Sequence, residues 1–216
     1  MDEKPVDSKR RFLMAVGLVG GIMPLRLAVA LTPTPPQPSG PFYPATLPLD
    51  DDNDLTRVAG SPQPAEGLST DLDGRLLDAG GNPIGGARIE IWQCDARGRY
   101  HHPRDRGKST PDPNFQGHGH TLTDAQGRYR FRTIHPVPYP GRTPHIHAAV
   151  FLQGRQVLVT QIYVEGEAGN EADFLYRRIP DDKRSLVTAK FAPGSPGQAR
   201  YRAGFDVVLG QTPDQT

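Results

Sequence analysis

The sequence contains a single cysteine, Cys94, among its 216 residues. One cysteine excludes an intramolecular disulfide and any metal cage built from several thiolates. An excess of charge of one sign is also lacking, because 25 Lys and Arg residues are balanced by 24 Asp and Glu residues. This balance gives no electrostatic footprint for a nucleic acid. We therefore expect neither a nucleic-acid partner nor a thiolate metal centre.

A long hydrophobic run is missing as well. The apolar run from Phe12 to Leu25 is shorter than the roughly 18 residues that a spanning helix needs, so we expect no permanent membrane span. It lies between a basic patch and an Ala-x-Ala sequence ending at Ala30, which is the order of an export signal. KRRFL at 9–13 is similar to a twin-arginine signal in which either Lys9 replaces the first arginine or the spacer residue is missing. We expect residues 1–30 to direct export to the periplasm, with cleavage near Ala30. The alternative is a disordered basic tail on a cytoplasmic protein.

Glycine and proline are abundant, with 24 and 23 residues, which suits short strands joined by tight turns. Residues 72–78 and 87–93 flank the turn sequence AGGNPIGG and predict a β-hairpin in which Ala87, Ile89 and Ile91 face one way. Further strands are predicted within 123–133, 146–151, 157–164 and 205–209. Only residues 170–190 favour helix. These patterns predict an all-β fold, an antiparallel β-sandwich core with long loops and one or two short helices.

Three regions follow from this organisation: the export signal (1–30), a proline-rich N-terminal arm (31–67) and the β-sandwich domain (68–212). LTPTPPQPSG at the start of the arm predicts an extended spacer. Residues 47–68 and 101–119 are polar and are expected to form loops, which commonly build the walls of a site.

All the histidines lie between residues 101 and 147: His101, His102, His118, His120, His135, His145 and His147. His145 and His147 are two residues apart in a predicted strand, so their side chains point to the same side. The same spacing at His118 and His120 shows that this pattern alone is weak. Tyr100 and Tyr139, however, end turn-rich segments of the same region, and two phenolates beside two neutral imidazoles suit a hard ion such as ferric iron. The competing interpretation makes these residues ordinary members of a sandwich.

Several longer motifs occur in a fixed order, and together they resemble the intradiol ring-cleavage dioxygenases, especially the β-subunit type of protocatechuate 3,4-dioxygenase. The motifs are GPFYP (40–44), GRLLDAGGNPIGGARIEIWQCDARGRY (74–100), DPNFQGHGHTLTDAQGRYRFRTIHPVPYPGRTPHIH (112–147), VTQIYVEG (159–166) and FDVVLG (205–210). The resemblance implies a non-haem Fe(III) centre held by Tyr100, Tyr139, His145 and His147. It also implies cleavage of a catecholic ring between its two hydroxyl-bearing carbons, with O₂, to a cis,cis-muconate-type diacid.

The resemblance assigns further roles. It implies that Tyr139 leaves the metal when catechol binds and takes up a substrate proton. Arg142 is implied to stabilise negative charge on the ring carbon that meets O₂. Gln161 matches a glutamine that the family carries on the neighbouring strand. Tyr43 is a candidate for the pocket wall, and His118 and His120 are interpreted as loop or rim residues. The partners are then a catecholic small molecule and O₂, with a homo-oligomer possible.

Two other classes remain open from the sequence. The segment from residue 72 to residue 133 is also typical of transthyretin-like β-sandwiches, which bind ligands without a metal and without catalysis. That class does not account for PYPGRTPHIH (138–147). A zinc hydrolase that uses His-x-His would need a carboxylate ligand or base, and no motif supplies one.

Overall fold

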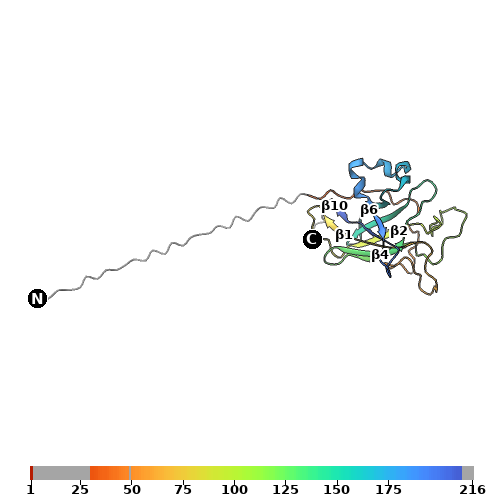
Figure 1. Ribbon diagram of the computed structural model, residues 1–216, viewed down its shortest axis with the longest axis horizontal. Helices are drawn as coiled ribbons and strands as arrows, with labels where there is room; N and C mark the ends of the chain where they lie inside the picture. Colours follow the sequence, from red (N-terminus) through yellow and green to blue (C-terminus); the bar gives the residue numbers. More distant parts are fainter. Residues whose placement is uncertain (2–29, 49, 211–216) are drawn as a thin grey trace.

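The computed structural model describes residues 30–48 and 50–210, together with Met1 (Figure 1). The export signal predicted for residues 1–30 therefore lies almost wholly outside the described residues. Among the helices of the described part, none is long and apolar enough to cross a membrane.

Two five-stranded sheets form the body of the protein, which confirms the predicted all-β sandwich. The first sheet contains β1 (Ser69–Asp78), β4 (Arg128–Ile134), β8 (Phe191–Pro193), β9 (Tyr201–Gly204) and β10 (Val207–Leu209). The second has the order β3 (His118–Leu122), β2 (Arg88–Trp92), β5 (His145–Leu152), β6 (Arg155–Val164) and β7 (Thr188–Ala189). The main core contains Leu72 and Leu76 of the first sheet and Ile89, Ile91 and Ile146 of the second.

The sheets are mixed rather than wholly antiparallel. Strand β1 pairs in parallel with β9 and β10, and β6 pairs in parallel with β7. Parallel neighbours require long connections, and the chain between β6 and β7 provides one. It contains three short 3-10 helices, η1 (Ala168–Ala172), η2 (Tyr176–Arg178) and η3 (Asp181–Leu186), which lie above the sheets in Figure 1. The helical prediction for 170–190 is therefore met by isolated 3-10 turns.

The predicted hairpin between residues 72–78 and 87–93 is wrong. Strand β1 pairs with β4, whereas β2 pairs with β3 and β5 in the other sheet. The glycine-rich connection therefore crosses from one sheet to the other. Both strands turn their apolar residues into the space between the sheets. Strands that face each other across the core therefore show the same apolar–polar alternation as strands paired in a hairpin, and the sequence pattern does not distinguish the two.

Strand β3 was not predicted. Residues 101–117 form the expected loop, but His118–Leu122 pairs along β2, with His118 opposite Trp92. Its sequence, HGHTL, lacks the apolar alternation that marks the other strands.

The second sheet presents one row of polar residues across three strands. His147 of β5 lies opposite Trp92 of β2 on one side and opposite Gln161 of β6 on the other. His145 lies opposite Tyr163 in the neighbouring row. Ile146 between them faces the core, so both histidines face away from it, toward the loops that cover this sheet. The imidazoles thus occupy a face that packs against loops rather than against the other sheet.

Candidate metal and substrate site

The four side chains predicted as ligands lie together on the loop-covered face of the second sheet. His145 and His147 are buried, with 3.2 Å between their Nε2 atoms. The ring of Tyr139 lies 5.5 Å from that of His145, and the rings of Tyr100 and Tyr139 are 5.4 Å apart, between centroids. Strand β5 supplies the histidines, and the loops after β2 and β4 supply the tyrosines. Residues separated by up to 47 positions in the sequence thus converge on one place.

Both imidazoles are neutral, and one tautomer is fixed. Burial, aided by Arg142, lowers the pKa of His145 to about 4 and holds that of His147 well below its usual range. Nδ1 of His145 lies 2.7 Å from the carbonyl oxygen of Thr143. Because a carbonyl only accepts, Nδ1 carries the proton and Nε2 presents its lone pair to the site. A neutral imidazole with its other nitrogen bonded to a carbonyl is the usual state of a metal-binding histidine.

Two buried polar groups at this point have no hydrogen-bond partner among the described residues: the Tyr100 hydroxyl and Nδ1 of His147. Buried polar atoms are nearly always satisfied, so an orphaned hydroxyl beside two imidazoles indicates a place for a bound group. Burial raises the pKa of Tyr100 and of Tyr139, so neither ionises at neutral pH without a cation to stabilise the phenolate.

The donor set fits a hard metal ion. In the described part of the chain no group of three or more His, Cys, Asp or Glu side chains could hold a metal, so a metal at this point needs the phenol oxygens. Two imidazole nitrogens and two phenolates, with no sulfur, suit ferric iron better than soft ions. The structure thus brings together all four residues that the sequence nominated.

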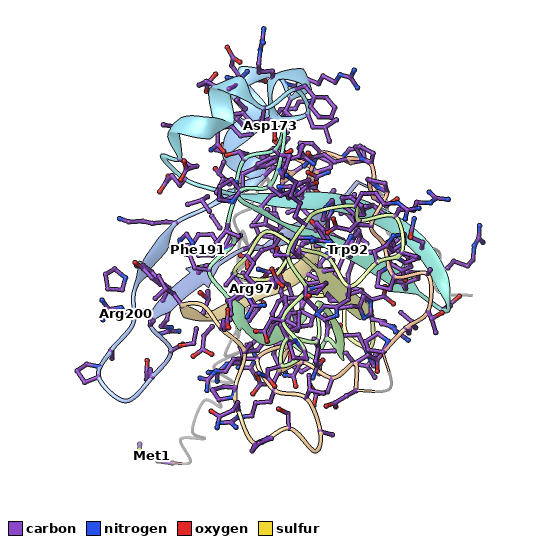
Figure 2. All side chains as sticks on the ribbon, turned by 90° about the vertical axis from the view of Figure 1, so that its right-hand side faces the viewer. Met1, Trp92, Arg97, Asp173, Phe191 and Arg200 are labelled. Atoms are coloured by element: carbon purple, nitrogen blue, oxygen red, sulfur yellow. The ribbon has the colours of Figure 1, made fainter. Side chains whose placement is uncertain are left out.

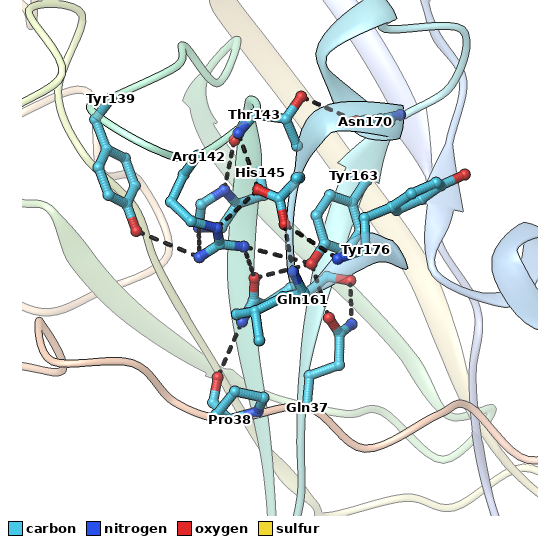
Figure 3. A network of polar contacts seen from close by, with 12 residues as sticks. Gln37, Pro38, Tyr139, Arg142, Thr143, His145, Gln161, Tyr163, Asn170 and Tyr176 are labelled. Carbon is cyan, nitrogen blue, oxygen red and sulfur yellow. Dashed lines mark hydrogen bonds and ion pairs between the residues drawn. The ribbon is translucent and has the colours of Figure 1, made fainter. Parts of the chain in front are cut away.

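The predicted residues Arg142 and Gln161 join the same site (Figure 3). Nη1 of Arg142 lies 3.4 Å from the Tyr139 hydroxyl and 3.4 Å from Nε2 of His145. Nη2 donates to Oε1 of Gln161 over 2.6 Å. The guanidinium therefore points at the ligand cluster, and Gln161 holds it from the next strand.

Asp173 completes this arrangement and was missed by sequence reasoning. Its Oδ2 accepts from Nε of Arg142 over 2.7 Å, and from the Thr143 amide over 3.0 Å. Burial opposes both charges, but the ion pair and the amide donors outweigh it, so the pKa of Arg142 is raised and that of Asp173 is lowered. Figure 2 shows Asp173 among the short helical turns that follow β6. The sequence marks it only as an acidic residue in a segment interpreted as partly helical.

The interpretation of His118 as a loop or rim residue is wrong. His118 is buried in β3, with Nε2 3.4 Å from Oε2 of Glu90. Tyr43, a candidate for the pocket wall, donates to the same Glu90 oxygen over 2.8 Å. Trp92, between these residues and the site, stacks on the His147 ring at 4.8 Å. The buried Glu90 accounts for both placements, because a buried carboxylate needs hydrogen-bonding partners.

A cavity of about 1080 Å³ opens beside the tyrosines. Its walls include Tyr100, Tyr139 and Arg142, and also Phe42, whose ring stacks on that of Tyr100 at 4.7 Å. The loop segment 105–109 lines it as well, in agreement with the expected role of the 101–119 loop. This volume lies at the upper end of small-molecule sites, so a single aromatic ring would leave part of it free.

Comparison with known proteins gives a consistent result. Residues 39–211 match a family model described as "Dioxygenase". The chain is 37% identical over 168 residues to the protocatechuate 3,4-dioxygenase beta chain of Burkholderia cepacia, covering 73% of this chain and 71% of that protein. It is 33% identical over 199 residues to a hydroxyquinol 1,2-dioxygenase of Corynebacterium glutamicum, covering 79% of this chain but 61% of that protein.

Solved structures show the same fold. The dioxygenase domain of a dioxygenase–carbohydrate-binding fusion from Streptomyces sp. SirexAA-E has a TM-score of 0.63 and 30% identity, covering 84% of this chain and all of that domain. Catechol 1,2-dioxygenase from Acinetobacter sp. ADP1 has a TM-score of 0.61 and 25% identity, and this chain covers 64% of it.

Proposed function

Because the chain belongs to the intradiol ring-cleavage dioxygenase family, we propose that it cleaves a catecholic ring between its two hydroxyl-bearing carbons, with O₂ as co-substrate. The product is a cis,cis-muconate-type diacid. The observation that carries the proposal is the convergence of two tyrosines, two neutral histidines and one fixed arginine. The tyrosines and the arginine of this group also line a cavity.

Tyr100, Tyr139, His145 and His147 would hold a non-haem ferric ion, which when bound acts as a Lewis acid toward the catechol. The two tyrosines differ in their surroundings. Tyr100 is 4% exposed, whereas Tyr139 is only partly buried. The more accessible Tyr139 is thus placed to yield its position to the substrate and to take a proton from a catechol hydroxyl.

Arg142 supplies a fixed positive charge. The carboxylate of Asp173 and the amide oxygen of Gln161 hold its guanidinium on two sides, which leaves Nη1 directed between Tyr139 and His145. A cation fixed before the reaction stabilises negative charge that develops on the ring without reorganising in the transition state.

The cavity rim favours a substituted, anionic catechol. Arg97 and Arg99 in the wall pair with Glu66 and Asp105. Three further cations of the wall form no ion pair with an acidic side chain among the described residues: Arg106, Lys108 and Arg178. Unpaired cations around a concave site attract anions, and the volume leaves room for a substituent beyond the ring. We therefore infer a catechol with an acidic side group as the preferred substrate class.

Oxygen-isotope labelling tests the reaction. The ferric-reconstituted chain is incubated under ¹⁸O₂ with one substrate at a time: catechol, protocatechuate, hydroxyquinol or a chlorocatechol. Mass spectrometry then measures the mass of each product. The proposal predicts a ring-opened diacid that carries both labelled oxygen atoms. Tight binding of catechols without ring opening would instead support the transthyretin-like binding module.

A further inference from the structure

The start of the N-terminal arm, the proline-rich residues 31–38, is hydrogen-bonded to both sheets. The Thr34 amide donates to the Val208 carbonyl of β10 over 3.0 Å. The Gln37 amide donates to the Val159 carbonyl of β6 over 2.8 Å. Proline restricts the backbone to extended conformations, so the arm loses little entropy when it docks. The segment expected as a spacer is thus extended, and it leads straight to the site.

The side chain of Gln37, in the lower part of Figure 3, makes polar contacts with three residues of β6. Its Oε1 accepts from the Tyr163 hydroxyl over 2.8 Å. Its Nε2 donates to the carbonyl oxygen of Gln161 over 3.2 Å and lies 3.3 Å from Oγ1 of Thr160. The Tyr163 hydroxyl lies 3.4 Å from Nη2 of Arg142, so two hydrogen bonds through Tyr163 connect Gln37 to the guanidinium.

The carbonyl of Pro38 fixes which way the Gln161 amide points. Nε2 of Gln161 donates to that carbonyl over 3.0 Å, which leaves Oε1 facing Nη2 of Arg142. A carbonyl only accepts, so the reverse orientation would lose this bond and place two donor groups against each other at Arg142. Gln161 is fully buried and has no water to compensate for such a loss.

We propose that Gln37 and Pro38 are positioning residues for ring cleavage: the arm orients Gln161 and Tyr163, and through them the guanidinium of Arg142. This inference rests on the proposed function, because it concerns the charge that Arg142 places at the reacting ring. It extends the site beyond the sandwich, since residues before the first strand hold a group that acts on substrate.

The test compares two glutamine variants in the full chain. Gln37→Ala removes the link between the arm and Tyr163. Gln116→Ala is the matched control, because Gln116 makes three similar bonds that pin another loop, to Asp52, Asp54 and Arg57. Gln37→Ala is expected to lower kcat about tenfold and to change KM less than twofold, because Arg142 acts mainly in the transition state. Gln116→Ala should lower thermal stability while leaving kcat within about twofold.

Three further readouts separate positioning from general destabilisation. Iron content and the visible spectrum should be unchanged in Gln37→Ala, because the ligands are untouched. Hydrogen exchange should become faster at residues 159–163 in Gln37→Ala and not in Gln116→Ala. In the double variant with Tyr163→Phe, the Gln37 substitution should add less than a twofold loss, since the Gln37 side chain reaches Arg142 through the Tyr163 hydroxyl.

The outcomes distinguish two failures. Suppose that the wild-type protein cleaves catechols. A Gln37→Ala variant with an equal kcat, or losses that multiply in the double variant, would then overturn the positioning role alone. Wild-type protein that turns over no catechol would overturn the ring-cleavage function, and the positioning role with it.

Discussion

Replacing Asp173 by Asn should both destabilise the protein and impair turnover. The carboxylate is inaccessible to solvent and pairs with an Arg142 side chain that is only 7% exposed. Its two oxygens accept four bonds: Oδ2 from Arg142 and Thr143, and Oδ1 from the amides of Leu175 and Tyr176. Asparagine keeps one acceptor oxygen, so in either orientation its NH₂ group faces two donors.

The size of the effect follows from this geometry. At least two hydrogen bonds are lost, and a buried guanidinium loses its counter-charge. Breaking a buried ion pair by removing one partner costs about 3–5 kcal/mol, and we expect a decrease of that size in the free energy of unfolding. Turnover should fall as well, because only Gln161 and Tyr163 then position the guanidinium of Arg142.

Urea unfolding and steady-state O₂ uptake measure the two effects. The control is Glu66→Gln, which breaks the exposed ion pair with Arg97 and should cost less than about 1 kcal/mol. The pKa of Asp173 is lowered in the folded state, so its stabilisation is complete above the unfolded value of about 4. The difference between wild type and Asp173→Asn should therefore shrink as the pH falls through that lowered pKa. A loss below about 1 kcal/mol at neutral pH, with unchanged kcat, would refute the reasoning.

Three other variants test the ligand set, the backbone conformation beside the site and the charge at the cavity wall. Tyr139→Phe should retain iron, alter the visible absorption and slow catechol binding; an unchanged spectrum would remove Tyr139 from the ligand set. Gly40→Ala should lower the free energy of unfolding by about 1–2 kcal/mol in urea titrations, because the glycine has φ +72, a left-handed conformation that a residue with a Cβ rarely adopts. The double variant Arg106→Gln, Lys108→Gln should lower kcat/KM about threefold more for protocatechuate than for catechol. This difference between the substrates should decrease as the salt concentration rises. The control Arg155→Gln, outside the cavity, should lower kcat/KM equally little for both substrates.

The sequence predicts the β-framework well wherever apolar residues alternate. All six expected strands are present, because Ile89 and Ile91, for example, must face the core that the two sheets share. The same alternation cannot say which sheet a strand joins, which is why the hairpin prediction failed. Strand β3 was missed because its core-facing positions, opposite Ile91 and Ile89, carry Gly119 and Thr121, so no apolar side chains alternate along it.

The candidate site shows a similar division. The four proposed ligands, Arg142 and Gln161 lie in motifs that mark them. Asp173 and Gln37 lie in segments without periodicity, and their importance arises only when the chain folds them against Arg142 and Tyr163. Contacts of this kind depend on long-range packing and leave no local pattern to detect.

The central claim is that two phenol oxygens and two imidazole nitrogens meet at one ferric ion. Iron analysis combined with a visible spectrum of the ferric-reconstituted full chain, beside His147→Ala, tests it most directly. The account predicts iron bound in equal proportion to the chain, with a tyrosinate-to-iron absorption band that His147→Ala loses or strongly weakens. A wild-type protein that stays colourless and free of iron, or a His147→Ala variant that keeps both the metal and the band, would contradict it.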